Sequence, residues 1–196
     1  MIGIGGAGVV GSRVAETLRL FSHQQICVYD TEQIIAQRLA GRLSGGEYQI
    51  SVVDRNAMKS AKVVVLCGPS PHFSIAKELL DASVSVVSTS DDIADCLNLL
   101  TLSQLAIENK ATLIVGAASS PGMSGLLVRH LAESFDSIDE VHVALHGTGG
   151  PACARQHHRA LSGQSIGWHD GEWLRRPAGS GRELCWFPEP VGAYDC

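Results

Sequence analysis

The sequence lacks the features that define several large classes of protein. No apolar run reaches the ~18–20 residues that a membrane-spanning helix needs, and the opening residues contain no basic segment of the kind that begins a secretory leader. Basic residues are not in excess, since 15 Lys and Arg stand against 20 Asp and Glu, which gives a net charge of −5. A negative chain with no basic arm argues against nucleic-acid partners. We therefore expect a cytoplasmic protein with neither nucleic-acid nor membrane partners.

Closely spaced cysteines are also missing. The six cysteines are widely spaced, never form a Cys-x-x-Cys pair, and in part lie in apolar runs such as Ile26-Cys27-Val28. Reduced core thiols have this pattern, whereas disulfide frameworks do not. Cys153, His157 and His158 have a workable spacing for zinc on one helix face, but no second ligand pair accompanies them. We expect neither disulfides nor a bound metal.

Apolar residues make up 45% of the 196 residues and charged residues 18%, which is enough for a globular core. The first 146 residues alternate short β-branched runs with helical patterns, as in βαβ units with a parallel sheet. After the linker at 147–151 the pattern changes, and residues 166–174 predict a hairpin with a turn at Asp170-Gly171. We predict a domain over 1–146 and, over 147–196, the beginning of a mixed α+β domain.

Two further elements are expected within the first domain. A cap at Asp91 or Asp92 predicts one long helix that runs to about Asn109. The apolar pattern at 140–145 predicts a last strand of the sheet.

A glycine-rich turn near the N-terminus predicts dinucleotide binding. Gly6-x-Gly8-x-x-Gly11 lies between a predicted strand at 1–4 and a predicted helix from about residue 9. In such turns the first glycine allows the tight bend, the second lets a pyrophosphate approach, and the third lets the helix pack closely on the sheet. The free N–H groups of the helix N-terminus then bind the phosphates. This pattern indicates a Rossmann-type doubly wound parallel sheet, with cofactor contacts from Gly6, Ala7, Gly8, Val9, Val10 and Gly11.

An acidic residue completes the fingerprint. Asp30 ends the second predicted strand, where a carboxylate accepts the ribose hydroxyls of adenosine and repels a 2′-phosphate, so NAD is favoured over NADP. Thr31 follows it and is counted with the cofactor site. Asp54 ends the third strand and lies either near the adenine or in a solvated loop. The alternative for the whole motif is an ordinary glycine turn with a capping aspartate.

Residues after later strands are candidates for the remaining part of the site. Gly68, Pro69 and Ser70 follow the apolar strand at 63–67 and face the nicotinamide half of the cofactor. His72 is a candidate proton donor or substrate ligand, or a surface residue at a helix start. Asp91 is a candidate substrate ligand or a helix cap.

Arg155, with Arg159 one turn further on, is a candidate clamp for substrate carboxylates or part of a solvated basic face. The sequence does not identify which of three candidates, His72, Asp91 or Arg155, is the general acid.

The sequence resembles the saccharopine dehydrogenase-like oxidoreductases, which include saccharopine reductases, lysine 6-dehydrogenase-like enzymes and carboxynorspermidine dehydrogenase-like enzymes. The resemblance rests on four stretches and on the tail around Trp168-x-Asp170-Gly171. The stretches are residues 5–12 with Asp30, 63–71, 86–92 and 121–124. It implies NAD(P)-dependent hydride transfer at a C–N carbon of an amino-acid-like substrate. Members of that family are longer, so the chain resembles their N-terminal part.

A second interpretation is a non-catalytic dinucleotide-binding module, or a remnant that acts through a partner subunit. The three tryptophans, Trp168, Trp173 and Trp186, separate the two interpretations, because exposed rings indicate a module or a face that pairs with a second chain. A homodimer is therefore also possible.

Overall fold

The computed structural model describes the chain except for residues 22–24, 46–48, 148, 161, 181 and 196. It divides into two compact units, Met1–Ser137 and Ile138–Cys196. This division falls earlier in the chain than the boundary at residue 146 that the sequence predicts.

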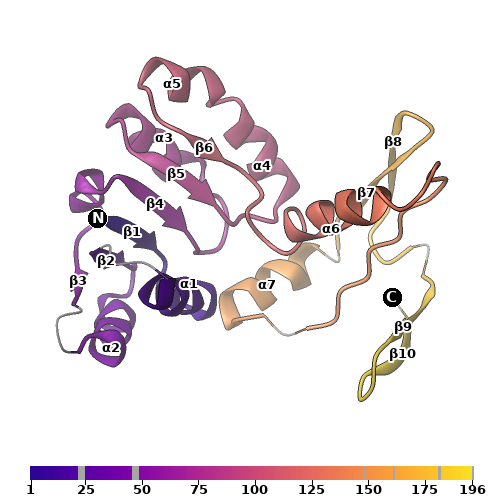
Figure 1. Ribbon diagram of the computed structural model, residues 1–196, viewed down its shortest axis with the longest axis horizontal. Helices are drawn as coiled ribbons and strands as arrows, with labels where there is room; N and C mark the ends of the chain where they lie inside the picture. Colours follow the sequence, from indigo (N-terminus) through magenta and orange to yellow (C-terminus); the bar gives the residue numbers. More distant parts are fainter. Residues whose placement is uncertain (22–24, 46–48, 148, 161, 181, 196) are drawn as a thin grey trace. The chain divides into compact units, whose positions relative to one another are not determined.

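The first unit contains a six-stranded parallel sheet (Figure 1). Its strands are β1 (Ile2–Gly5), β2 (Ile26–Tyr29), β3 (Ile50–Val52), β4 (Val63–Leu66), β5 (Ser85–Ser88) and β6 (Leu113–Ile114). They lie in the order β3-β2-β1-β4-β5-β6, which is the strand order of a Rossmann fold. Gly5 at the end of β1 pairs with Tyr29 on β2 and with Leu66 on β4, so these strands end together. The predicted fold class is confirmed.

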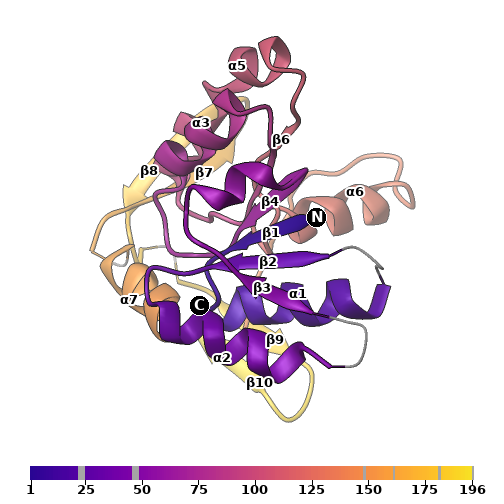
Figure 2. The ribbon, with the colours of Figure 1, turned by 90° about the vertical axis from the view of Figure 1, so that its left-hand side faces the viewer.

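Helices cover both faces of this sheet (Figure 2). They are α1 (Val9–Phe21), α2 (Gln33–Leu43), the 3₁₀ helix η1 (Ala57–Ser60), α3 (Phe73–Asp81), α4 (Ile93–Leu100) and α5 (Ser103–Glu108). A further helix, α6 (Met123–Ala132), follows β6 and has no buried residue. Side chains of α1 and α2 form one core cluster with Ile26 and Val28 of β2. Side chains of α3, α4 and α5 form the other, which includes Cys27 from the opposite face of the same strand. Within the described ranges, no helix combines the length and apolar character needed to cross a membrane.

Two predicted elements differ in the structure. The prediction of a single long helix is wrong, because the chain forms two helices, α4 and α5, with a break after Leu100. At the break the Thr101 hydroxyl donates to the Asn98 carbonyl at 2.6 Å and competes with the helical hydrogen bonds. The strand predicted at 140–145 is also wrong, because residues 140–147 pair with no strand. Val141 and Val143 are about half exposed, so their alternating apolar pattern is not buried on any sheet.

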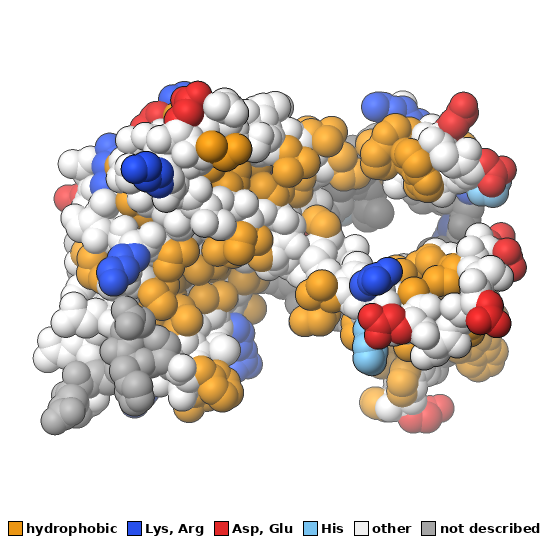
Figure 3. All heavy atoms as spheres, turned by 45° about the horizontal axis from the view of Figure 1, so that its top comes forward, with side chains coloured by type: hydrophobic (Ala, Val, Ile, Leu, Met, Phe, Trp, Pro, Cys, Tyr) orange, Lys and Arg blue, Asp and Glu red, His pale blue; other side chains and the backbone are white. Residues whose placement is uncertain are grey.

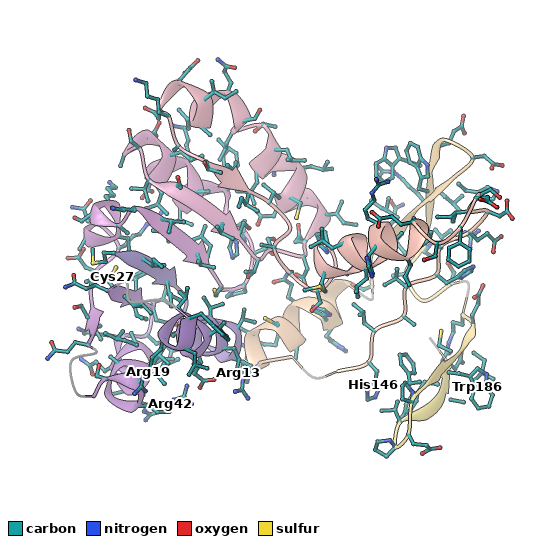
Figure 4. The ribbon with its side chains drawn as sticks, in the orientation of Figure 1. Arg13, Arg19, Cys27, Arg42, His146 and Trp186 are labelled. Atoms are coloured by element: carbon teal, nitrogen blue, oxygen red, sulfur yellow. The ribbon has the colours of Figure 1, made fainter. Side chains whose placement is uncertain are left out.

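The second unit contains one helix and two antiparallel hairpins. Its elements are α7 (Pro151–Ala160), β7 (Gln164–His169), β8 (Glu172–Pro177), β9 (Leu184–Phe187) and β10 (Gly192–Asp195). The predicted hairpin is confirmed, and its turn has positive φ angles at Asp170 (48°) and Gly171 (83°). Trp168 and Trp173 face each other across it, with ring centroids 5.0 Å apart at 84°. His146 (labelled in Figure 4) comes from the segment before α7, and its ring packs beside Tyr194 of the β9–β10 hairpin with ring centroids 5.2 Å apart.

Candidate dinucleotide-binding site

The turn between β1 and α1 contains the three glycines of the motif. Two of them have no room for a side chain, and the third has free space around it. Gly6 has a φ of +99°, and a Cβ there would lie 2.6 Å from the backbone nitrogen of Gly68. A Cβ on Gly11 would overlap the carbonyl oxygen of Gly6. A Cβ on Gly8, in contrast, would have no atom within 4 Å. The surroundings of Gly8 therefore match a position where a ligand approaches the backbone.

The first turn of α1 is accessible from this open space. The helix begins at Val9, and the N–H of Ser12 donates to the Gly8 carbonyl at 2.9 Å. The preceding N–H groups have no acceptor within the helix, and the helix dipole places partial positive charge there. Gly8, Val9 and Val10 are exposed, and no acidic residue occupies the first turn. The arrangement fits a pyrophosphate.

Asp30 lies beside this turn, immediately after β2. Its Oδ2 accepts a hydrogen bond of 2.7 Å from the N–H of Ala7, and its Oδ1 accepts one of 2.9 Å from the N–H of Glu32. The exposed Thr31 hydroxyl also donates a longer hydrogen bond of 3.4 Å to Oδ1. A carboxylate has about four lone-pair sites, so one remains for a ribose hydroxyl. Asp30 thus holds the glycine turn and keeps acceptor capacity for an adenosine ribose.

Asp54 has a local role at the end of β3. Its Oδ1 accepts a hydrogen bond of 2.8 Å from the N–H of Ala57, the first residue of η1, and the residue is exposed. This bond caps the 3₁₀ helix, which favours the loop-acid interpretation over an adenine contact.

The loop after β4 lies against the glycine turn. The N–H of Cys67 donates to the Gly5 carbonyl at 2.7 Å, and Gly68 is the residue that a side chain at Gly6 would strike. Pro69 is exposed, and Gly68 and Ser70 are half-buried. Strands β1 and β4 are neighbours where the strand order reverses, which is where dinucleotides bind in such sheets. Gly68 and Asp30 therefore lie on opposite sides of β1. A residue that contacts the nicotinamide half of the cofactor would have the position of Gly68.

The thiol of Cys67 does not supply a nucleophile to this loop. Burial raises the pKa of Cys67 to about 12, so the thiol stays protonated near neutral pH.

His72 is buried behind this loop rather than exposed at a surface helix start. Its side chain is 3% exposed, Nε2 is 2.8 Å from the Gly68 carbonyl oxygen, and Nδ1 is 2.8 Å from the Ser88 hydroxyl. Both ring nitrogens are therefore engaged by atoms of this chain. The candidate role of His72 as a proton donor stays a prediction.

Asp95 belongs to the same buried group, and the sequence interpretation missed it. Its carboxylate is 3% exposed and accepts hydrogen bonds from the N–H groups of His72 (2.9 Å) and Phe73 (3.2 Å), so it caps α3 from another helix. One signal was available in the sequence. Asp95 lies four residues before Leu99, which places a carboxylate on the buried face of a helix.

The other candidates lie in two different units. Asp91 is exposed at the start of α4, where Asp92 caps the helix by accepting from the N–H of Asp95 at 2.8 Å. Arg155 is exposed on α7 of the second unit. Among the described residues, no group of three or more His, Cys, Asp or Glu side chains is arranged to hold a metal ion.

A Gly-x-Ser-x-Gly pattern also escaped the sequence interpretation. Residues 163–167 match the sequence signature of a hydrolase nucleophile elbow, but Ser165 lies on β7 and pairs with Arg176 of β8. An elbow requires a strand, a sharp turn and a helix, so this serine has the wrong structural context.

Apolar surface is exposed outside the glycine turn as well as at Val9 and Val10. A shallow pocket of about 370 Å³ lies between α5 and the edge strand β6, lined by Ile107, Leu113, Val115 and neighbouring residues. Hydrophobic side chains gather on the surface (Figure 3), and none of the residues of α6 is buried. The residues that line the pocket include none of the candidate cofactor-site residues.

The first unit thus has a Rossmann fold, with a glycine turn after β1 and an acidic residue after β2. No family model matches the chain, and no curated protein matches it.

Solved structures resemble it at low identity. One is UDP-N-acetylglucosamine 3-dehydrogenase GnnA from Acidithiobacillus ferrooxidans, with 19% identity and a TM-score of 0.52 over 66% of this chain and 42% of that one. Another is GenD2 from gentamicin A biosynthesis in complex with NAD, with 18% identity and a TM-score of 0.54 over 72% and 41%. A third is the biliverdin reductase of Synechocystis in complex with biliverdin and NADP+, with 21% identity and a TM-score of 0.52 over 68% and 41%.

These similarities establish the fold. The chain spans less than half the length of each of these three proteins. None of the three is named as a saccharopine dehydrogenase, so the comparisons do not show that family.

Proposed function

We propose that the first unit binds NAD(H) and that the chain is the dinucleotide-binding part of an NAD-dependent oxidoreductase. One observation carries the proposal. Gly8 opens onto free space at the N-terminus of α1, between two glycines that tolerate no side chain. The bound cofactor would supply the hydride chemistry, and the residues of this chain would bind and orient it.

The preference for NAD over NADP depends on Asp30. Its carboxylate is held beside the turn at 2.7 Å from the Ala7 nitrogen, so it cannot easily move away from an adenosine ribose. A 2′-phosphate placed next to this carboxylate would experience repulsion of ~1 kcal/mol per pair of unit charges at 4 Å in water, and ~4 kcal/mol at a protein surface. We therefore expect NADH to bind at least tenfold more tightly than NADPH.

Calorimetric titration of the 196-residue chain with NADH and with NADPH tests this proposal. The informative variant is Asp30→Asn, which removes the charge; its one amide oxygen still accepts from the Ala7 N–H, and the bond from the Glu32 N–H is lost. We expect the NADH-to-NADPH affinity ratio to fall by about tenfold, which corresponds to ~1.4 kcal/mol. Asp54→Asn is the matched control, since this acid ends the neighbouring strand and caps η1; it should leave the ratio within twofold.

Two outcomes would contradict the proposal. A folded wild-type chain that binds neither dinucleotide would refute dinucleotide binding itself. Preference for NADPH, or an equal change of the ratio in Asp54→Asn, would refute the role given to Asp30.

For the substrate, we propose an amino-acid-like compound with hydride transfer at a C–N carbon. The saccharopine dehydrogenase-like stretches predict this reaction. The solved structures are named for different substrates, such as a UDP-sugar and biliverdin. Formation of NADH with a panel of amino acids and secondary-amine amino acids, compared with a panel of polyols, tests the point. Turnover confined to the polyols would contradict it.

A non-catalytic dinucleotide-binding role is the second candidate function. What supports it is the exposure of the tryptophans, which is 61% for Trp168, 69% for Trp173 and 78% for Trp186. Exposed aromatic rings on the second unit are the feature expected of a surface that pairs with another chain. This candidate predicts NADH binding with no turnover in either panel, and restored turnover in the presence of a partner subunit.

A further inference from the structure

The imidazole of His72 connects three segments at the carboxyl edge of the sheet. The carbonyl of Gly68 can only accept a hydrogen bond, so His72 Nε2 carries the hydrogen that lies between them at 2.8 Å. In the neutral ring, Nδ1 then accepts from the Ser88 hydroxyl at 2.8 Å. That hydroxyl oxygen in turn accepts from the N–H of Ser90 at 3.2 Å. In the neutral imidazole, Nε2 is thus a donor and Nδ1 an acceptor, and each has a hydrogen-bond partner.

The backbone that carries this ring is also held. Asp95 accepts from the N–H groups of His72 and Phe73, and Asp92 accepts from the N–H of Asp95. His72, Ser88 and Asp95 are each at most 3% exposed. These three side chains are therefore shielded from solvent, and the Gly68 carbonyl connects the ring of His72 to the loop beside the glycine turn.

We propose that His72 is a positioning residue for the nicotinamide half of the dinucleotide, an inference that rests on the proposed function. By holding the Gly68 carbonyl, the ring sets the position of the β4–α3 loop, whose Gly68 nitrogen lies against Gly6. The adenosine half is bound on the other side of β1, by Asp30 after β2. Loss of the His72–Gly68 hydrogen bond should therefore disturb one half of the cofactor site and leave the other half intact.

Two substitutions of His72 distinguish the hydrogen bond of Nδ1 from that of Nε2. Asn at position 72 places its side-chain oxygen near the site of Nδ1 and keeps the bond from Ser88, but cannot reach Gly68. Gln at position 72 places its amide nitrogen near the site of Nε2 and keeps the bond to Gly68. Wild type, His72→Asn and His72→Gln are each titrated as the 196-residue chain with NADH and with ADP-ribose, which lacks the nicotinamide.

We expect His72→Asn to weaken NADH binding by about tenfold, while its ADP-ribose affinity stays within twofold of wild type. His72→Gln should recover most of the NADH affinity. The ADP-ribose titration also reports folding, because this ligand requires an intact glycine turn. A variant that binds ADP-ribose normally has a folded first unit.

Three results would overturn the inference. The first is NADH binding by His72→Asn that equals wild type. The second is an equal loss for NADH and ADP-ribose, which would assign His72 a general structural role only. The third is a failure of His72→Gln to bind NADH better than His72→Asn. Absence of ADP-ribose binding by the wild-type chain would instead refute the proposed function, and with it the inference that depends on it.

Discussion

Replacement of Gly11 by alanine tests the geometry of the glycine turn, because two physical effects predict opposite signs. Gly11 lies in α1, where alanine is favoured over glycine by ~1 kcal/mol of intrinsic helix propensity. The new Cβ, however, would overlap the Gly6 carbonyl oxygen and lie 3.3 Å from a methyl group of Ile4, which is fully buried. Overpacking of this kind costs ~1–3 kcal/mol, and more where backbone must move. The overlapped atom belongs to the backbone, so we take the upper end of this range, ~3 kcal/mol; after the ~1 kcal/mol propensity gain is subtracted, we expect a net loss of ~2 kcal/mol in the free energy of unfolding.

Urea unfolding followed by far-UV circular dichroism measures this change. Tryptophan fluorescence is unsuitable, because all three tryptophans lie in the second unit. The thermal midpoint of the first unit should fall by ~4–8 °C. A Gly11→Ala chain that is more stable than wild type would refute the close approach of α1 to the turn.

Gly8→Ala is the matched variant for the same experiment. Gly8 has no left-handed φ, and its Cβ would meet no atom within 4 Å. We expect the free energy of unfolding to stay within ~0.5 kcal/mol of wild type and the NADH affinity to fall at least tenfold, because the methyl group would occupy the phosphate position. Unchanged NADH affinity in a stable Gly8→Ala chain would show that the pyrophosphate binds elsewhere.

Two further predictions concern other residues of the first unit. Burial raises the pKa of Cys67 from its usual 9.0 to about 12, so its contribution to stability is complete below pH 9.0 and is lost as the pH rises toward 12. We expect iodoacetamide at pH 8 to leave Cys67 unmodified in the native chain and to modify it in urea, as mass spectrometry would show; rapid native modification would contradict its burial. The Glu16 carboxylate bridges Arg13 and Arg42, both at 2.9 Å, and so connects α1 to α2 (Figure 4). Because all three groups are solvent-accessible, Glu16→Gln should cost less than ~1 kcal/mol of unfolding free energy, and a loss that persists in 1 M NaCl would contradict an electrostatic cause.

Local patterns were sufficient to predict the geometry of the glycine turn. Strand, glycines, helix and Asp30 follow one another within 30 residues, and each glycine has a physical role that short-range geometry dictates. The hairpin turn at Asp170-Gly171 was predictable for the same reason, because positive φ at both positions favours those residue types.

Long-range contacts explain what the sequence alone did not show. The cap that Asp95 provides joins α4 to the start of α3, and no spacing within one element indicates that pairing. The contact between Gly6 and Gly68 depends on the pairing of β1 with β4, strands that are far apart in the chain. The pattern at Val141 and Val143 looks like a strand in isolation, yet a strand forms only where a sheet edge pairs with it.

The bond between Ala7 and Asp30 has a consequence for the thermodynamics of ligand capture. Together with the Cys67–Gly5 bond, it ties the ends of β2, β1 and β4 to one another before any ligand arrives. A ligand that spans these three strand ends then meets a surface already in its bound shape, and little conformational entropy is lost on association. The chain pays this ordering cost when it folds, so affinity at this edge of the sheet depends on the stability of the first unit.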